Sequence, residues 1–337
     1  MMEKQKKLIL NILKYLFFLV LGIGLFLWVY RDQDTRSLWA GLSEFHYGWI
    51  FASLGVALIS HFLRALRWRM LLDSIGYKPG ILNTFLSVLV MYLANFAAPR
   101  MGEVTRCGIL ARYEKIPFTA QLGTVVIERM VDVVLLLLII ISVLLFDWNV
   151  LTDYIASKVS VQDSGKYAFL TSWWAISIAA LLVSMAILAV VFRKRLLKTG
   201  FAKKIMSYVE KFVEGLKSIL HLKKPGIFIL LTLGIYACYY LMTWFVMIAF
   251  SPTTQLSPFV ALAVLAMGSV GMVLPTQGGI GTYHTFVVAT LTLYGTSEFN
   301  STLLAFVLHG STSVFLIFIG AIALIILPIV NPSRKPV

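Results

Sequence analysis

Ionisable residues inside or at the edges of long apolar runs are the first candidates for chemistry in this sequence. A charged side chain at the centre of a bilayer costs about 3 kcal/mol on insertion scales, so such groups usually face an interior cavity and have partners. Arg64 and Arg67 are three positions apart, which places them on one face of a helix. Because guanidinium groups bind phosphate oxygens in a bidentate manner, this face predicts phosphate binding, with simple anchoring of the helix end as the alternative.

A second cluster surrounds a proline that interrupts an apolar segment. Asn95 precedes Pro99 and Arg100, and Glu103 and Arg106 follow at intervals of three. On a helix this spacing places the carboxylate between two guanidinium groups on one face. The cluster predicts either a substrate-binding group or a self-neutralising structural network, and both interpretations need a polar cavity.

A third cluster opens a long uncharged run. Glu128 and Asp132 are four positions apart, on one face of a helix, with Arg129 beside them. We expect the acidic pair to balance Arg100 and Arg106 across a helix bundle. The alternative is that the two carboxylates bind a proton or a cation.

A fourth feature is a helix-breaking segment after Pro275. It combines Gln277, Gly278, Gly279, Gly281 and His284. A helix that begins near Gly281 would point its free amides and its positive dipole end into the bundle, which predicts an anion site. His284 could titrate or donate a hydrogen bond there, and the alternative is a core histidine with a satisfied ring.

The apolar runs between these clusters predict the fold. The 337 residues are 59% hydrophobic and only 13% charged, whereas a soluble domain carries roughly a quarter charged residues. A bilayer core about 30 Å thick needs about 20 apolar residues in a helix. Runs of that length cover residues 8–30, 48–66, 123–146, 168–192, 227–250 and 302–330. The sequence therefore predicts an all-α polytopic membrane protein, with 1–337 as one transmembrane domain, and excludes a soluble globular enzyme.

Basic residues between the runs set the expected orientation, because cytoplasmic loops carry the excess of Lys and Arg. Both termini and the strongly basic segment 193–224 are therefore expected on the cytoplasmic side of the cell membrane, with 1–30 retained as the first span. Residues 201–222 predict an amphipathic helix, either interfacial or packed on the bundle. The net charge of +14 follows from these loops and does not indicate a nucleic-acid partner.

Two further apolar segments do not fit as plain spans. Segment 81–113 begins and ends among charges expected inside, and segment 258–294 begins and ends outside. Pro99 interrupts the first segment and a glycine-rich stretch interrupts the second. We therefore expect about six full transmembrane helices and two re-entrant hairpins, at about 81–113 and 258–294, that enter from opposite faces. The alternative, two short full spans in each hairpin, conflicts with the shortness and charge of 101–113.

These motifs, in this order and spacing, resemble the lysylphosphatidylglycerol synthase transmembrane-domain family, also called the flippase-like membrane domain family, from about residue 10 to 328. The matching pieces are Arg64-x-x-Arg67-Trp68, Asn95-x-x-x-Pro99-x-x-Gly102-Glu103-x-x-Arg106, Glu128-Arg129-x-x-Asp132 and Pro275-x-x-Gly278-Gly279-x-Gly281. The family commonly has Pro at the position of Gln277 and Glu at the position of His284. Some members carry a soluble aminoacyl-transferase domain, which we do not expect here, so the resemblance implies lipid handling or translocation and not aminoacyl transfer.

The leading hypothesis is a lipid transporter or flippase whose substrate is an anionic phospholipid or a polyprenyl-phosphate-linked lipid. The expected substrate-binding residues are Arg64, Arg67, Asn95, Arg100, Glu103, Arg106, Glu128, Arg129, Asp132, Gln277, Gly278, Gly279, Gly281 and His284. No catalytic activity is expected, because no nucleophile–base pair, HExxH motif or nucleotide loop occurs, and no cofactor or metal is expected. The alternatives are an enzyme acting on lipid-linked substrates and a non-transporting scaffold of an envelope biosynthesis complex.

Overall fold

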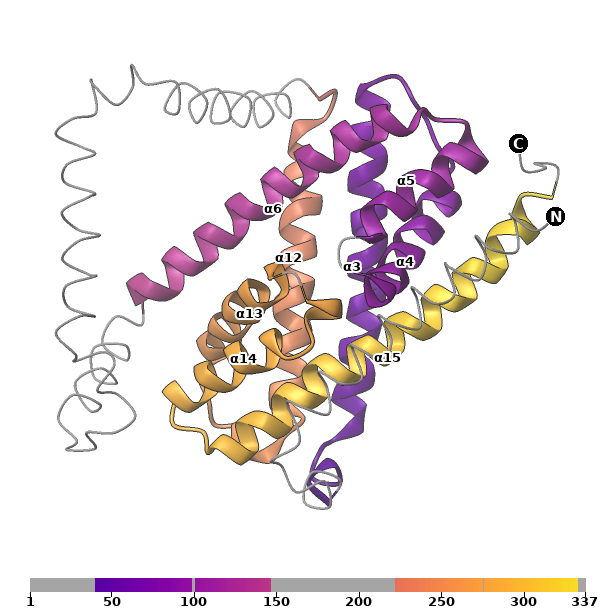
Figure 1. Cartoon of the computed structure of the whole chain (residues 1–337). Helices are drawn as coiled ribbons and strands as arrows, with labels where there is room; N and C mark the ends of the chain where they lie inside the picture. The colour runs from indigo at the N-terminus through magenta and orange to yellow at the C-terminus, as the bar shows by residue number, and fades with distance from the viewer. Residues whose placement is uncertain (1–39, 99–100, 147–221, 275, 333–337) are drawn as a thin grey trace, which may run out of the picture. The chain divides into compact units, whose positions relative to one another are not determined.

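The computed structural model describes residues 40–98, 101–146, 222–274 and 276–332 (Figure 1). In this part of the chain the regular elements are helices, and an isolated β-bridge joins Phe45 to Phe250. The long helices are α3 (Tyr47–Ser74), α6 (Phe118–Phe146), α12 (Pro225–Ile248) and α15 (Glu298–Val330). All four are long and apolar enough to cross a membrane. The prediction of an all-α polytopic membrane protein is confirmed.

The four long helices match four of the predicted spans. Helix α3 runs about two turns beyond the predicted end at residue 66, because the polar residues that follow still belong to the helix and pack on its neighbours. The predicted spans 8–30 and 168–192 lie outside the described residues, as does nearly all of the predicted amphipathic helix 201–222. Almost all described residues belong to one compact unit, 1–143 with 222–337, and the other unit, 144–221, is described only over 144–146. The assignment of 1–337 to one domain stays a prediction.

Each predicted hairpin is a pair of short helices separated by a break. The pairs are α4 (Ile81–Ala97) with α5 (Met101–Glu114), and α13 (Pro258–Val273) with α14 (Thr282–Leu293), and short 3₁₀ turns lie at η2 (Ser251–Thr253) and η3 (Gln277–Gly279). Ala98 and Leu274, which precede the two prolines, are extended, as the proline ring requires of the residue before it. At the second break Gly278 and Gly281 have positive φ angles of 56° and 85°, which favour glycine.

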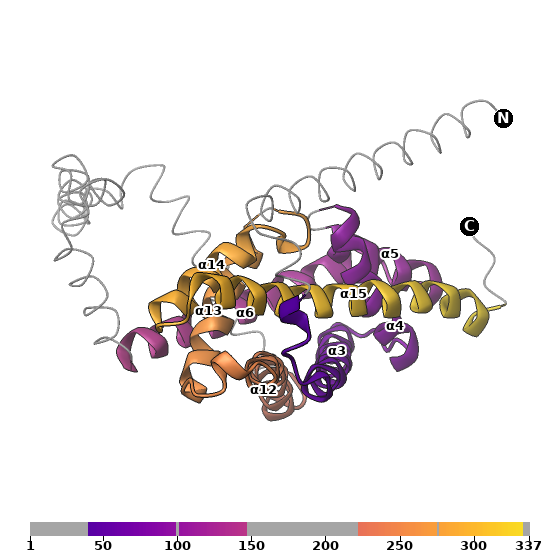
Figure 2. The same ribbon diagram turned by 90° about the horizontal axis from the view of Figure 1, so that it is seen from below.

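The two hairpins enter the unit from opposite ends. Helices α3 and α12 lie side by side (Figures 1 and 2), and they are antiparallel. The stacked rings of Phe45 and Phe250 join the start of α3 to the end of α12, and Lys223 Nζ lies 3.7 Å from Asp73 Oδ2 at the other end. Because α4 follows the end of α3 and α13 follows the end of α12, their hairpins start at opposite ends.

The tips of the hairpins meet inside the unit. A Cβ atom built on Gly278, in the second tip, would lie 2.7 Å from the ring of Phe96 in the last turn of α4. The chain therefore repeats one pattern twice: a long helix, a broken hairpin and a long helix, first as α3 to α6 and then as α12 to α15. The two copies run in opposite directions. This is the inverted-repeat layout of many secondary transporters, whose binding sites lie at the broken helices.

Candidate functional site

A buried carboxylate organises the ionisable residues of three helices. Glu128, on α6, is fully buried and accepts hydrogen bonds from three guanidinium groups. Arg64 Nη1 and Arg67 Nη2, both from α3, lie 3.0 Å from Glu128 Oε1, and Arg106 Nη2, from α5, lies 2.6 Å from Glu128 Oε2. Glu128 thus links α6 to α3 and to α5 of the first hairpin.

Asp132, one turn further along α6, extends the same network. Its Oδ1 lies 2.8 Å from Arg67 Nη2, and its Oδ2 lies 3.3 Å from Arg64 Nη1 and 3.2 Å from Arg129 Nη2. The Asp132 side chain is 14% exposed, whereas that of Glu128 is 0% exposed. Helical spacing produces this arrangement, because residues three or four apart share a face and two such faces meet here.

Helix α12 contributes polar groups from the second repeat. Tyr239 OH accepts a hydrogen bond of 2.8 Å from Arg64 Nη2, and Thr232 Oγ1 accepts one of 3.4 Å from Arg67 Nη1. Tyr236 OH donates to the backbone carbonyl of Asp132 at 2.8 Å. The ion network therefore lies at the junction of the two repeats.

Aromatic packing holds the third guanidinium group. Arg106 Cζ lies 4.4 Å from the ring centre of Trp68, a distance that allows a cation–π interaction. Trp68 is fully buried, and its Nε1 donates to Thr124 Oγ1 at 3.0 Å. The indole therefore fixes the Arg106 side chain while leaving part of its donor capacity unused.

The network carries excess positive charge and unused donors. Four guanidinium groups, from Arg64, Arg67, Arg106 and Arg129, face the two carboxylates, which leaves two net positive charges. Arg106 Nε and Nη1, Arg64 Nε and Arg67 Nε are buried and have no hydrogen-bond partner within the described residues. A buried donor without a partner costs about 1–3 kcal/mol. An anionic oxygen brought among these groups would therefore be bound favourably.

The ion pairs between the carboxylates and the arginines differ from those predicted from the sequence in two respects. The acidic pair balances Arg64 and Arg67 as well as Arg106, so the first two arginines are largely committed to carboxylates. No ion pair joins Arg106 to Glu103 in the described part of the chain, and the buried Glu103 Oε2 has no partner there. The reason is that Arg106 is turned towards α6, where Glu128 lies. Arg100 lies outside the described residues.

The first hairpin tip is closed by Asn95. Its Oδ1 accepts a 2.8 Å hydrogen bond from the backbone N–H of Gly102, at the start of α5. A Cβ on Gly102 would collide with the Met91 carbonyl and the Asn95 side chain, so only glycine allows this close approach. Asn95 thus satisfies one of the free amides at the start of the returning helix.

The second hairpin tip is tied to the last long helix. His309 Nε2, on α15, lies 2.7 Å from the Gly278 carbonyl, and because a carbonyl only accepts, Nε2 carries the proton. His284 Nδ1 accepts from the Gly281 N–H at 3.4 Å, and the His284 and His309 rings lie 4.9 Å apart. Gly279 is buried in the same turn. The side chain of Gln277 lies outside what the structure describes.

Helix α4 connects the ion network to the two tips. His61 is one turn before Arg64 on α3, and its ring lies 4.3 Å from that of Tyr92. Both ring nitrogens of His61 are buried without a partner in the described part. Tyr92 is one turn before Phe96, which contacts Gly278. A continuous row of polar and aromatic groups thus joins the guanidinium groups to the second tip.

Sequence reasoning did not single out Tyr236, Tyr239 and Thr232, and His309 was given no role. Tyrosines in an apolar helix carry no spacing signal, and His309 stands alone in a long apolar run. The role of His309 follows from its position opposite the glycine-rich break of the second hairpin. A sequence does not show which residues of different helices face each other.

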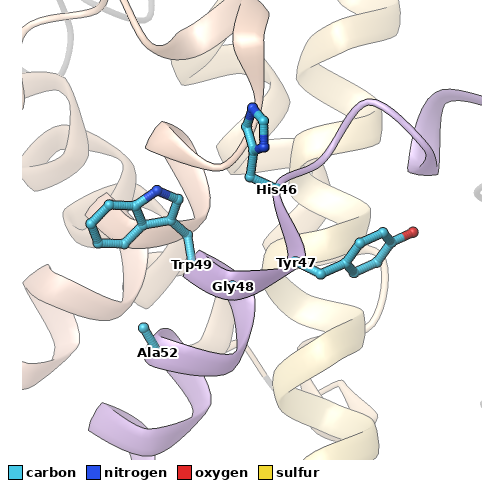
Figure 3. Close-up of a pocket in the computed structure, with 5 residues that line it drawn as sticks. All are labelled: His46, Tyr47, Gly48, Trp49 and Ala52. Carbon is cyan, nitrogen blue, oxygen red and sulfur yellow. The ribbon is translucent and has the colours of Figure 1, made fainter.

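A surface pocket at the start of α3 lies away from this site. It has a volume of about 640 Å³ and is lined by His46, Tyr47, Gly48, Trp49 and Ala52 (Figure 3). Trp49 and Arg64 are separated by fifteen positions of one helix, which corresponds to about 22 Å at 1.5 Å per residue. Trp and Tyr side chains at a helix end, such as Trp49 and Tyr47, are typical of a membrane interface.

Comparison with known proteins agrees with the resemblance carried by the motifs. The family described as the lysylphosphatidylglycerol synthase TM region matches residues 11–320. A UPF0104 membrane protein of Methanocaldococcus jannaschii is 35% identical over 91 residues, which cover 26% of this chain and 27% of that protein. The chain therefore matches about a quarter of the length of this relative. No solved structure matches the chain.

Proposed function

We propose, from the premise that this multi-pass chain belongs to the lysylphosphatidylglycerol synthase TM region family, that it is a membrane lipid transporter of the flippase type. Its substrate is an anionic phospholipid or a lipid-linked polyprenyl phosphate. The headgroup binds in the polar interior between the two hairpins, and the acyl chains stay in the surrounding lipid. Both termini lie on the cytoplasmic side of the cell membrane.

The buried network around Glu128 is the observation that carries this proposal. It holds more guanidinium groups than carboxylates, and its unused donors belong to buried arginines. A charge at membrane depth is expensive and usually marks a substrate or ion pathway. A phosphate group supplies the negative charge and the acceptor oxygens that the network lacks.

Arg106 is the residue we assign to the headgroup most directly. Only its Nη2 is used by Glu128, whereas Nε and Nη1 remain without a partner in the described part of the chain. Arg106 lies on α5, four positions after Gly102, so it moves with the first hairpin. A small displacement of this hairpin would therefore move a headgroup bound to Arg106 past α3 and α12.

Binding and release suit this site better than covalent chemistry, so we propose a transporter and not an enzyme. Glu128 and Asp132 are held by several guanidinium groups each. A carboxylate paired in this way stays ionised, whereas a general acid or base has to exchange a proton at the working pH. The alternative, an enzyme acting on lipid-linked substrates, predicts a covalent change in lipids extracted after incubation.

The test is translocation of a fluorescent phosphatidylglycerol in proteoliposomes by the Arg106→Gln variant. Gln keeps much of the side-chain volume, and Glu128 retains its contacts with Arg64 and Arg67, so the fold should persist. A hydrogen bond to a charged group contributes about 1.5–3 kcal/mol, so we expect a loss of about tenfold or more in rate. Arg69→Gln, at an exposed arginine of α3, is the matched control. Undiminished transport by folded Arg106→Gln protein would refute the assignment.

A further inference from the structure

A second pocket lies between the first hairpin and the last long helix, on the outer side of α5. It has a volume of about 410 Å³, and its lining includes Gly108 and Arg112 from α5 and Leu324, Leu327 and Pro328 from α15. On α5 the buried residues Arg106 and Leu110 face inward, whereas Gly108 and Arg112 are exposed and one turn apart on the opposite face. This pocket, the α5–α15 groove, is therefore separate from the ion network.

The middle of the groove is apolar and open. A Cβ atom built on Gly108 meets no atom within 4 Å, so the glycine leaves a gap that a hydrocarbon chain can fill. Leu324 is 48% exposed on a helix that is apolar enough to cross a membrane. Exposed leucines on such a helix face lipid, and the groove therefore opens to acyl chains.

One end of the groove is cationic. Arg112 is in the last turn of α5, its guanidinium lies 5.3 Å from the ring centre of Tyr113, and no carboxylate pairs with it in the described part of the chain. Glu114, the nearest acidic residue in sequence, accepts a hydrogen bond from Asn83. An unpaired guanidinium above an apolar groove matches a lipid with a negative headgroup.

A proline adds an acceptor to the same end. Pro328 has no N–H, so the carbonyl of Leu324, four residues earlier on α15, lacks its usual helical partner. Leu324 and Pro328 both line the groove. The groove thus offers a cation for a phosphate, the Leu324 carbonyl as an acceptor for a headgroup donor and an apolar channel for a chain.

We propose that the α5–α15 groove is a binding site for an anionic phospholipid of the leaflet at this end of the bundle. One acyl chain lies over Gly108 and along Leu324, and the phosphate contacts Arg112. The lipid touches both the first hairpin and the last long helix. This site is additional to the central one and does not depend on transport.

The experiment is native mass spectrometry of purified protein with phosphatidylglycerol or phosphatidylcholine of identical acyl chains. Every protein carries Arg106→Gln, so that binding at the central site is weakened equally in all of them. Arg112→Gln should weaken phosphatidylglycerol binding about tenfold, the effect of one charge-assisted hydrogen bond. It should weaken phosphatidylcholine binding less, because the choline cation already offsets the charge of that phosphate. Gly108→Leu, which fills the groove without a backbone clash, should weaken binding of both lipids.

Arg69→Gln is the matched control, because Arg69 is also an exposed arginine but does not line the groove. It should bind both lipids as the Arg106→Gln protein does. Equal phosphatidylglycerol binding by the Arg112→Gln and Arg69→Gln proteins would overturn the headgroup assignment. Loss of a protein dimer on Gly108→Leu, with lipid binding unchanged, would identify the occupant as a second copy of the chain and overturn the proposal.

Discussion

Replacing Glu128 with Gln should destabilise the protein more than any single change at an arginine of the network. The substitution removes the buried charge that faces three guanidinium groups, at 3.0, 3.0 and 2.6 Å. Asp132 is then left to balance them. Breaking a buried ion pair by removing one partner costs about 3–5 kcal/mol, because the remaining charge stays buried. Arg106→Gln should cost less, about 1.5–3 kcal/mol, because Glu128 keeps two partners.

The measurement is the free energy of unfolding in mixed micelles, obtained by titration with a denaturing detergent. The double variant Glu128→Gln, Arg106→Gln should be more stable than the sum of the single effects predicts, by about 1–3 kcal/mol, because it removes a charge together with its partner. Arg69→Gln serves as the exposed control. A Glu128→Gln protein within about 0.5 kcal/mol of the unsubstituted chain would show that the network is not a buried electrostatic unit.

Three other predictions test the hairpins. Gly278→Ala should lower the free energy of unfolding by about 1–3 kcal/mol, because Gly278 has a φ of 56° and its Cβ would press on Phe96; unchanged stability would contradict the contact between the tips. His309→Phe should slow lipid translocation, because the Gly278 carbonyl loses its donor, whereas His309→Gln, which can still donate, should retain more activity. In a cysteine-free background, Tyr47→Cys, at the exposed first residue of α3, and Lys78→Cys, at an exposed position beyond its end, should react with an impermeant thiol reagent from opposite sides of the membrane. Labelling of both from one side would refute the opposed entry of the hairpins.

Local rules explain why the helices and their breaks could be predicted. An apolar run long enough to span a bilayer has few other stable forms, so composition alone indicated α3, α6, α12 and α15. Proline restricts the backbone of the residue before it, and glycine accepts positive φ angles. The breaks at Ala98 and Gly278 could therefore be predicted from the residue types at and next to these positions. The asymmetry of basic residues between the runs then indicated hairpins in place of further spans.

Periodicity also predicted which charged residues share a face, but not which face they meet. Arg64 with Arg67, and Glu128 with Asp132, are paired by helical spacing. That spacing contains no information on the angle at which two helices cross or on their relative shift. The sequence interpretation therefore matched the acidic pair to the arginines of the first hairpin, whereas the packing of α3 on α6 brings Arg64 and Arg67 to it as well.

What the sequence alone determined about this protein is its local architecture: spanning helices, two broken segments and the faces on which charges gather. These depend on helix periodicity, proline and glycine stereochemistry and the cost of charge in lipid. Only the tertiary structure decided that Tyr239 from the second repeat completes the arginine network and that His309 holds the Gly278 carbonyl. Those contacts join residues 175 and 31 positions apart, and their formation depends on how whole helices pack, which no local pattern encodes.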